Sequence, residues 1–324
     1  MIKRNFCTLF DRNYLLKGIA MIQSLKKHCP EAHVYVLCMD KKTKDILLKL
    51  NLSCISCVSL DDIETNELLD VKKNRSPREY CWTLTSCFTW YILDKDEMID
   101  FITYLDADLL FYSPIEPIFN EIQKSSIAII EHRFPEWLKH LEINGRFCVQ
   151  WISFRRDIEG MACLSRWREQ CIEWCYYKLE DGKLGDQKYL DEWPDLYKNC
   201  HIIQHIGAGV APWNYCEYNF DSDNNKSILV NNSQLIFYHF HGFQMLSNGE
   251  FDRISNFYTK KSPAPEMVYK AYEKTLLSLL KTIKEIEPDF SDGLKEIKKI
   301  ELYRILNKYT PSFLKNSLRK LLDY

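Results

Sequence analysis

The start of the chain alternates short apolar runs with longer amphipathic stretches. Residues 6–10, 33–39 and 53–60 are apolar and rich in β-branched, aromatic or other strand-compatible residues, which is typical of buried strands. Residues 15–27 and 41–50 carry apolar side chains at helical spacing between those runs. The order strand–helix–strand–helix–strand predicts a parallel sheet joined by right-handed crossovers.

Segments of the same kinds continue through the middle of the chain. Residues 101–112 form an apolar run that Asp106 and Asp108 interrupt, so a strand is expected to end at Asp106. Residues 62–78 are polar and charged, and we expect a surface segment there. Further helices are predicted at residues 79–93 and 158–179, and further strands at residues 125–130, 146–154 and 234–240. The chain is therefore predicted to be an α/β protein with a mixed, mostly parallel sheet flanked by helices.

The pattern changes after Pro263, where the chain becomes helical and basic. Three helices are expected there, at residues 266–286, 294–306 and 311–322. We therefore expect a large α/β domain over residues 1–260 and a helical C-terminal extension over residues 261–324. The basic, amphipathic residues 295–324 suit either helices that cap the large domain or a peripheral contact with an anionic membrane.

Composition and charge narrow the class of protein. The chain has 324 residues, of which 46% are hydrophobic, so it can bury one large core. Its formal net charge of -2 argues against a general nucleic-acid binder. The sequence has no apolar run long enough for a membrane span, and its first residues do not form the apolar segment of a signal peptide. The 13 cysteines are therefore expected to be reduced, mostly buried thiols of a cytoplasmic protein.

The two carboxylates at the end of the 101–105 run carry the first chemical hypothesis. In open α/β sheets, ligands bind outside the carboxyl ends of the strands. Asp106 and Asp108 would repel each other there unless a cation or protons compensate. A divalent metal that holds a diphosphate would provide that compensation. The alternative is an acidic pair that only marks a strand end facing water.

Other polar residues also follow apolar runs. His205 precedes Gly207 in a loop whose backbone could approach a phosphate or sugar, and His239 and His241 end a predicted strand. These strand ends could converge with the carboxylates, although ordinary hydrogen-bonded histidines and an ordinary loop would give the same pattern. Asp186, followed by Gln187, is best explained from the residues alone as a helix N-cap.

Taken together, these motifs resemble those of a known enzyme class. The matching segments are residues 8–14, 24–25, 104–108, 185–190, 211–214 and 238–242. In this order they resemble nucleotide-sugar glycosyltransferases of the GT-A fold, a Rossmann-like fold. The similarity is greatest to retaining enzymes of family eight and to related bacterial cell-surface polysaccharide transferases.

The resemblance implies roles for individual residues. Asp106, Asp108 and His239 would be the ligands of a divalent metal, Mn²⁺ or Mg²⁺. Asp186 and Gln187 would lie beside the transferred sugar as catalytic residues, which replaces the helix-cap interpretation. Contacts to the nucleotide sugar are expected from Thr8, Asp11, Tyr14, Asp106, Ala107, Asp108, His205 and Gly207.

Two segments depart from the family pattern. Family-eight enzymes often follow the late histidine with Lys-Pro-Trp, whose lysine meets the diphosphate. Here residues 243–247 read Phe-Gln-Met-Leu-Ser, so either another cation arrives from elsewhere or the metal carries more of the charge. An Asn-x-Gly segment that is common in the family is replaced by residues 147–151, Phe-Cys-Val-Gln-Trp.

The activity implied by the resemblance is metal-dependent transfer of a sugar from a nucleoside diphosphate, by default UDP. The acceptor would be a glycan or a lipid-linked saccharide, and the anomeric configuration would be retained. The enzyme would be cytoplasmic, and one location there would be the inner face of the membrane. One alternative is a phosphotransferase or phosphohydrolase with Asp106 as nucleophile. Another is a catalytically inactive scaffold with the same fold.

Overall fold

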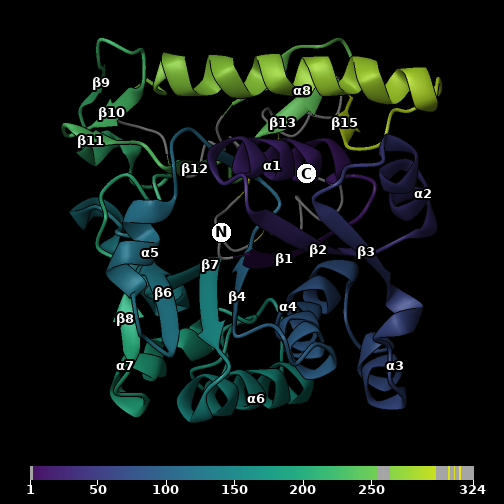
Figure 1. Ribbon diagram of the computed structural model, residues 1–324, viewed down its shortest axis with the longest axis vertical. Helices are drawn as coiled ribbons and strands as arrows, with labels where there is room; N and C mark the ends of the chain where they lie inside the picture. The colour runs from purple at the N-terminus through teal and green to yellow at the C-terminus, as the bar shows by residue number, and fades with distance from the viewer. Residues whose placement is uncertain are drawn as a thin grey trace.

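A seven-stranded sheet forms the centre of the molecule, in the order β3-β2-β1-β4-β7-β6-β8 (Figure 1). The computed structural model describes residues 3–253, 258, 263–296, 306, 310 and 314. The strands of this sheet are β1 (Arg4–Phe10), β2 (Ala32–Cys38), β3 (Ile55–Ser59), β4 (Phe101–Leu105), β6 (Ile127–Glu131), β7 (Phe147–Arg155) and β8 (Cys200–Ile202). Every pairing in it is parallel except those of β7, which runs antiparallel to both β4 and β6. The expected mixed, mostly parallel sheet is confirmed.

Helices cover both faces of this sheet (Figure 1). The helices are α1 (Leu15–His28), α2 (Lys41–Leu50), α3 (Asn66–Lys72), α4 (Pro77–Lys95), α5 (Glu116–Ile122), α6 (Ile158–Glu173), α7 (Trp193–Leu196) and α8 (Glu266–Ile286). Side chains of β1 alternate between the two cores, with Phe6 and Phe10 packed in the α1 core and Cys7 and Leu9 in the α4–α6 core. A strand that is buried on both faces must be apolar throughout, which explains the uninterrupted apolar runs.

Three smaller sheets lie beside the main one. The pair β5 (Leu109–Phe111) and β12 (Phe237–His239) is antiparallel. The other two consist of β9 (Phe220–Ser222), β10 (Ile228–Val230) and β11 (Ser233–Gln234), and of β13 (Gln244–Leu246), β14 (Phe251–Asp252) and β15 (Leu294–Lys295). Strand β5 continues the chain from β4 after Asp106 and Asp108. Its pairing with β12 therefore positions the residues that follow these carboxylates.

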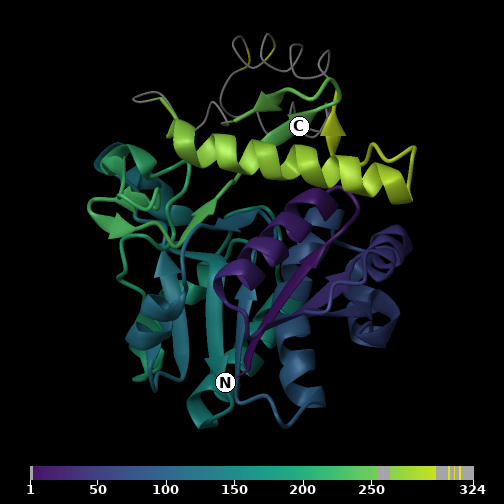
Figure 2. The same cartoon turned by 45° about the horizontal axis from the view of Figure 1, so that its top comes forward.

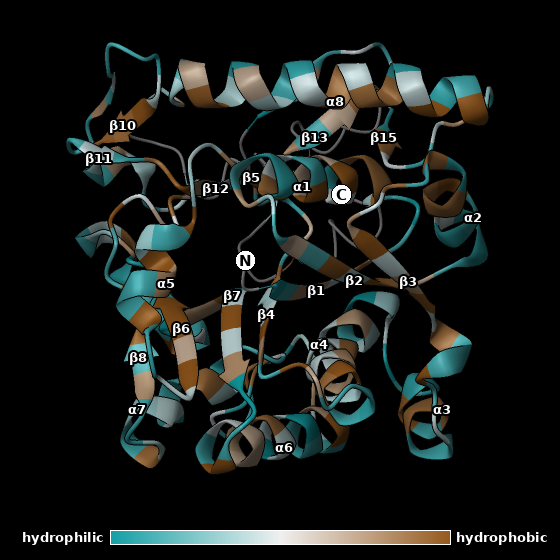
Figure 3. Cartoon of the chain, in the orientation of Figure 1, coloured by the Kyte–Doolittle hydropathy of each residue, from teal (hydrophilic) through white to brown (hydrophobic). Residues whose placement is uncertain are grey.

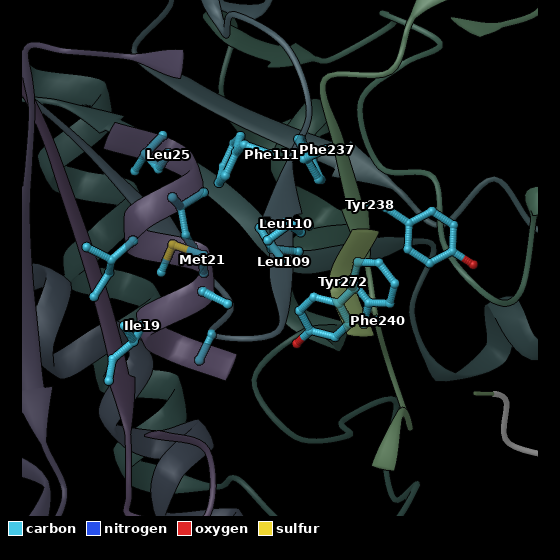
Figure 4. Close-up of a cluster of buried hydrophobic side chains, with 14 of the residues drawn as sticks. Ile19, Met21, Leu25, Leu109, Leu110, Phe111, Phe237, Tyr238, Phe240 and Tyr272 are labelled. Atoms are coloured by element: carbon cyan, nitrogen blue, oxygen red, sulfur yellow. The ribbon is translucent and has the colours of Figure 1, made fainter. Parts of the chain in front are cut away.

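Helix α8 packs against α1 and covers the core that contains the α1 side chains (Figures 1 and 2). Its buried residues recur at helical spacing, and hydrophobic and hydrophilic patches alternate along its length (Figure 3). Tyr272 of α8 stacks on Phe240 with ring centroids 3.8 Å apart. In Figure 4, Leu109 and Leu110 of β5 lie between the α1 side chains and this aromatic pair. The described part of the expected C-terminal extension thus shares a core with the α/β domain.

Several sequence-based expectations need correction. The segment 62–78 contains the helix α3, whose Leu68 is buried, and Arg75 is 8% exposed, so this segment is not merely a surface strip. The predicted helix from residue 158 ends at Glu173, and the predicted strand 234–240 is split between β11 and β12. Residues 294–295 form strand β15 instead of starting a helix. The expected helix at 311–322, most of the one at 294–306, and the lysines and arginines proposed for membrane contact lie outside the described residues.

Two further observations concern the cysteines and the helices. All 13 cysteines are free thiols, as expected. Within the described ranges, no helix has the length and apolarity that crossing a membrane requires.

Two adjacent leucines of α8 test how this helix is held. Leu276 is 1% exposed and Leu277 is 44% exposed. We expect Leu276→Ala to lower the free energy of unfolding by about 2–5 kcal/mol, because it leaves a cavity in the core. Leu277→Ala should change it by less than about 0.5 kcal/mol. Urea unfolding followed by circular dichroism measures both, and equal losses would mean that α8 is not held by this face.

Candidate functional site

Two distant parts of the chain meet at the end of β4. Asp106 and Asp108 follow β4, and β5 then pairs with β12 so that Leu109 lies opposite His239. The backbone N–H of Phe240 donates to the Asp108 carbonyl oxygen at 2.8 Å. As a result, His239 Nε2 lies 3.0 Å from Asp108 Oδ1 and 3.9 Å from Asp106 Oδ2. The structure therefore brings together the three residues expected to bind metal.

The antiparallel strand β7 brings two more residues to the same place. Leu105 pairs with Trp151, and the next N–H, that of Asp106, donates to the Gln150 carbonyl oxygen at 3.3 Å. Because β7 is antiparallel to β4, its N-terminal end lies beside the carboxyl end of β4. The Cys148 sulfur is thereby within 4.8 Å of the ligand atoms of Asp106 and His239.

Sequence reasoning did not assign Cys148 or Gln150 to the site. The signal available in the sequence was the departure from Asn-x-Gly at residues 147–151. It did not place these residues at the site, because the sequence does not give the direction of this strand in the sheet. Gln150 Oε1 accepts a hydrogen bond from His239 Nδ1 at 3.1 Å. This contact leaves His239 Nε2 directed at the carboxylates.

Charge at the centre of the site is balanced between His239 and Asp108. Burial lowers the pKa of His239, but the Asp108 carboxylate and, to a lesser extent, the Cys148 sulfur together outweigh burial and raise this pKa well above the usual value. Burial raises the pKa of Asp108, but His239 outweighs that effect and the pKa is lowered. His239 is 3% exposed and Asp108 is 6% exposed, so in the metal-free protein they form a buried ion pair.

Aromatic packing fixes the histidine. Trp213 meets the ring of His239 edge-on at 5.2 Å and donates its Nε1–H to the His132 carbonyl oxygen at 2.7 Å. Asn214 donates to the same oxygen at 2.8 Å. His241 is exposed, with its ring 5.6 Å from that of His239.

Asp186 lies near the carboxylates and is almost fully buried. It is 5% exposed, and Trp167 Nε1 donates to its backbone oxygen at 2.8 Å. Burial, and then the charge of Asp106, raise the pKa of Asp186 to about 8. The helical turn that follows begins at Lys188 and has no side-chain cap, so the N-cap interpretation of Asp186 was wrong. Gln187 donates to the Asn144 carbonyl oxygen at 3.0 Å.

The loop after β1 forms another wall of the site. Asp11 Oδ1 accepts from the backbone N–H groups of Asn13 and Tyr14, at 2.9 and 3.2 Å, and so shapes the entry into α1. Tyr14 is 42% exposed, and its charged surroundings include Asp108 and Asp106. Thr8 is fully buried in β1, and its hydroxyl has no hydrogen-bond partner among the described residues.

A buried lysine also faces this site. Lys17, in α1, is 8% exposed, and its ammonium lies 4.5 Å from the centre of the Tyr14 ring. It donates to the Phe243 carbonyl oxygen at 2.8 Å. Burial lowers the pKa of Lys17, and attraction to Asp108 opposes that effect. A cation therefore reaches the site from the first helix.

His205 and Gly207 lie in a different setting. His205 N–H donates to Glu121 of α5, and its Nδ1 accepts from the N–H of Gly207. A Cβ on Gly207 would lie 1.9 Å from the Gln234 carbonyl oxygen, so glycine is needed there for backbone packing. None of the interactions of His205 in the described chain involves Asp106 or Asp108. Ala107, by contrast, lies between these two aspartates in the sequence and is buried.

The donor atoms at the strand ends fit a divalent cation. One ligand atom each from Asp106, Cys148 and His239 lies within 4.8 Å of the others, a spacing that metal bonds of about 2.0–2.3 Å can bridge. Asp108 adds a carboxylate oxygen next to His239. Carboxylate and imidazole ligands suit Mn²⁺ and related ions. Binding would displace the proton that His239 and Asp108 share.

Comparisons with known proteins identify the family and the fold of this chain. The family model described as glycosyl transferase family 8 matches residues 5–245. The chain is 32% identical to the uncharacterized protein YfnD of Bacillus subtilis (strain 168) over 295 residues, which cover 89% of this chain and 94% of YfnD. It is 31% identical over 293 residues to the uncharacterized protein YfnF of the same strain, covering 88% of this chain and 96% of YfnF. The crystal structure of the glycosyltransferase GlyE from Streptococcus pneumoniae TIGR4 has the same fold, with a TM-score of 0.50 and 14% identity over 87% of this chain and 64% of GlyE.

The raised pKa of Asp186 predicts a pH-dependent effect of Asp186→Asn in the metal-free protein. The folded state favours the protonated carboxyl of Asp186. The contribution of this residue to the free energy of unfolding is therefore complete below about pH 4 and is lost as the pH rises towards about 8. Asparagine cannot ionise. The variant should therefore gain stability relative to the wild type across this window, by at most about 1.4 kcal/mol per pH unit.

Urea unfolding from pH 4 to pH 8 in the presence of a chelator measures this difference. Asp181→Asn, at an exposed carboxylate in the same segment, is the matched control and should leave the pH dependence unchanged. A constant difference between Asp186→Asn and the wild type at all pH values would contradict the prediction.

Proposed function

Because this chain belongs to glycosyl transferase family 8, we propose that it transfers a sugar from a nucleoside diphosphate, by default UDP, to a glycan or lipid-linked saccharide. It is a glycosyltransferase with the GT-A fold. We further propose that transfer depends on Mn²⁺ or Mg²⁺ and retains the anomeric configuration. The observation that carries the proposal is the convergence of Asp106, Asp108 and His239 at the strand ends. Polysaccharide synthesis would be the setting for such a reaction.

Metal dependence is supported by the chemistry of the site. Enzymes of this family are generally metal-dependent, and the residues at the strand ends provide a possible metal site. Asp106, Asp108 and His239 would hold the ion. When bound, it would neutralise charge that develops on the leaving diphosphate. Gln150, through its contact with His239 Nδ1, keeps Nε2 directed at the ion.

The nucleotide would bind along the loop after β1. Tyr14 offers an exposed ring at the rim, and Asp11 fixes the backbone of this turn. Thr8 is fully buried in β1 and presents no exposed surface to a nucleotide. Tyr14 and Asp11 are therefore the residues that support a nucleotide bound between α1 and the carboxylates.

The transferred sugar would lie next to Asp186 and Gln187. A largely protonated Asp186 can donate a hydrogen bond to a sugar hydroxyl and does not need a cation as partner. This role is consistent with retention, since it does not use Asp186 as a base on the acceptor. If NMR of the first-formed product showed inversion, Asp186 would instead be the general base.

Lys17 would supply the cation that meets the diphosphate. Its ammonium uses one donor on the Phe243 carbonyl, and an ammonium has three. It is buried near Asp108, where a phosphate oxygen would offset the cost of burying the charge. The lysine that the family often carries after the late histidine is thus replaced in function from α1.

Thermal unfolding with nucleoside diphosphates, with and without Mn²⁺, tests the proposed function. UDP and Mn²⁺ together should stabilise the wild type by about 2.7 kcal/mol when UDP is at a hundredfold its dissociation constant. Asp108→Asn should lose this stabilisation, whereas Asp94→Asn, at an exposed carboxylate of α4, should keep it. The proposal fails if no nucleoside diphosphate stabilises the folded wild type at any metal concentration.

Lys17→Met tests the diphosphate contact. Loss of a charge-assisted hydrogen bond of about 1.5–3 kcal/mol should weaken UDP binding by about 10-fold or more in isothermal titration. Uridine, which has no phosphate, should bind the variant as it binds the wild type. Lys27→Met, at an exposed lysine of the same helix, is the control. Equal UDP affinity in Lys17→Met and the wild type would rule out the contact.

A further inference from the structure

Cys148 is the one sulfur among the ligand atoms that meet at the strand ends. Its Sγ, an Asp106 oxygen and a His239 nitrogen all lie within 4.8 Å of one another. The thiol is 5% exposed and comes from the N-terminal end of β7, beside the point where β4 ends. It thus shares the small volume that a metal held by Asp106 and His239 would occupy.

The surroundings hold this sulfur in place. The imidazoles of His132 and His239 both lie against the thiol. His132 is itself fixed, because its Nδ1 lies 3.2 Å from the Arg146 carbonyl oxygen and its ring stacks on Phe134 at 4.7 Å. A metal ligand that is oriented by such a surrounding shell loses little freedom on binding.

We propose that Cys148 is a thiolate ligand of the metal, which makes this a mixed oxygen, nitrogen and sulfur site. This inference rests on the proposed metal site of the glycosyltransferase and deepens it. As the S–metal bond forms, the S–H bond breaks and the proton leaves to solvent, with no change of oxidation state. Carboxylate ligands suit Mg²⁺, whereas thiolate ligands favour softer ions. The site should therefore bind Zn²⁺ and Co²⁺ in preference to Mg²⁺.

Titration of the metal-free, full-length protein with Co²⁺ tests the ligand directly. A thiolate–Co²⁺ bond gives a charge-transfer absorption band that oxygen and nitrogen ligands do not give. The wild type should show this band at one equivalent of Co²⁺. Cys148→Ser should lack the band and bind Co²⁺ about 10-fold more weakly or worse, with little change in Mg²⁺ affinity. Cys87→Ser, at a thiol of α4 that is also 5% exposed, is the matched control and should behave as the wild type.

The outcomes separate this inference from the proposed function. Co²⁺ binding without the band in the wild type, or an unchanged band in Cys148→Ser, overturns the sulfur ligand and leaves the metal-dependent glycosyltransferase intact. No binding of Co²⁺, Mn²⁺ or Mg²⁺ to the folded wild type overturns both. If Cys148→Ser does not fold, X-ray absorption of the wild-type Zn²⁺ complex decides the question: a sulfur at about 2.3 Å supports the inference, and a shell without sulfur overturns it.

Discussion

The contact between Asp108 and His239 is the constraint on which the site depends. Their side chains meet at 3.0 Å although Asp108 directly precedes β5 and His239 ends β12, two strands that are far apart in the chain. Removing either partner would leave a buried charge without compensation, which is costly in a protein interior. The surrounding core maintains the contact, because Phe240, next to His239, stacks on Tyr272 of α8. The C-terminal helix therefore supports the site without contributing a ligand.

The antiparallel direction of β7 is a second constraint on which side chains form the site. In a fully parallel sheet, the carboxyl end of β7 would lie beside that of β4, and Arg155 would approach the carboxylates. Because β7 is reversed, its N-terminal residues Cys148 and Gln150 approach them instead. Gln150 contacts His239, and the Cys148 sulfur lies within 4.8 Å of ligand atoms of Asp106 and His239. The strand direction thus determines which side chains complete the site.

The sequence predicted those parts of the structure that hydrophobic periodicity controls. The bounds of α2 and α8 agree with the predicted ranges at both ends, and burial of one face gives each helix the apolar spacing that predicted it. The convergence of Asp106, Asp108 and His239 was also expected, on the premise that their strands end at one edge of a single sheet. It arises differently, because β12 lies outside the main sheet and pairs antiparallel with β5. The helix α3 was missed because its one buried residue, Leu68, lies within a highly charged segment. Cys148 was missed because its position depends on strand direction, which periodicity does not encode.

The placement of Lys17 shows how a departure from a family pattern can be compensated through the backbone. Residues 243–247 lack the lysine that the family often carries after the late histidine. The same segment nevertheless provides a cation to the site, because the Phe243 carbonyl oxygen holds the ammonium of Lys17. A carbonyl can do this whatever the side chain, and the side chain of Phe243 packs in the core against Tyr272. The charge that a diphosphate requires would then come from α1, so the position of the charges describes this site better than the motif after the late histidine.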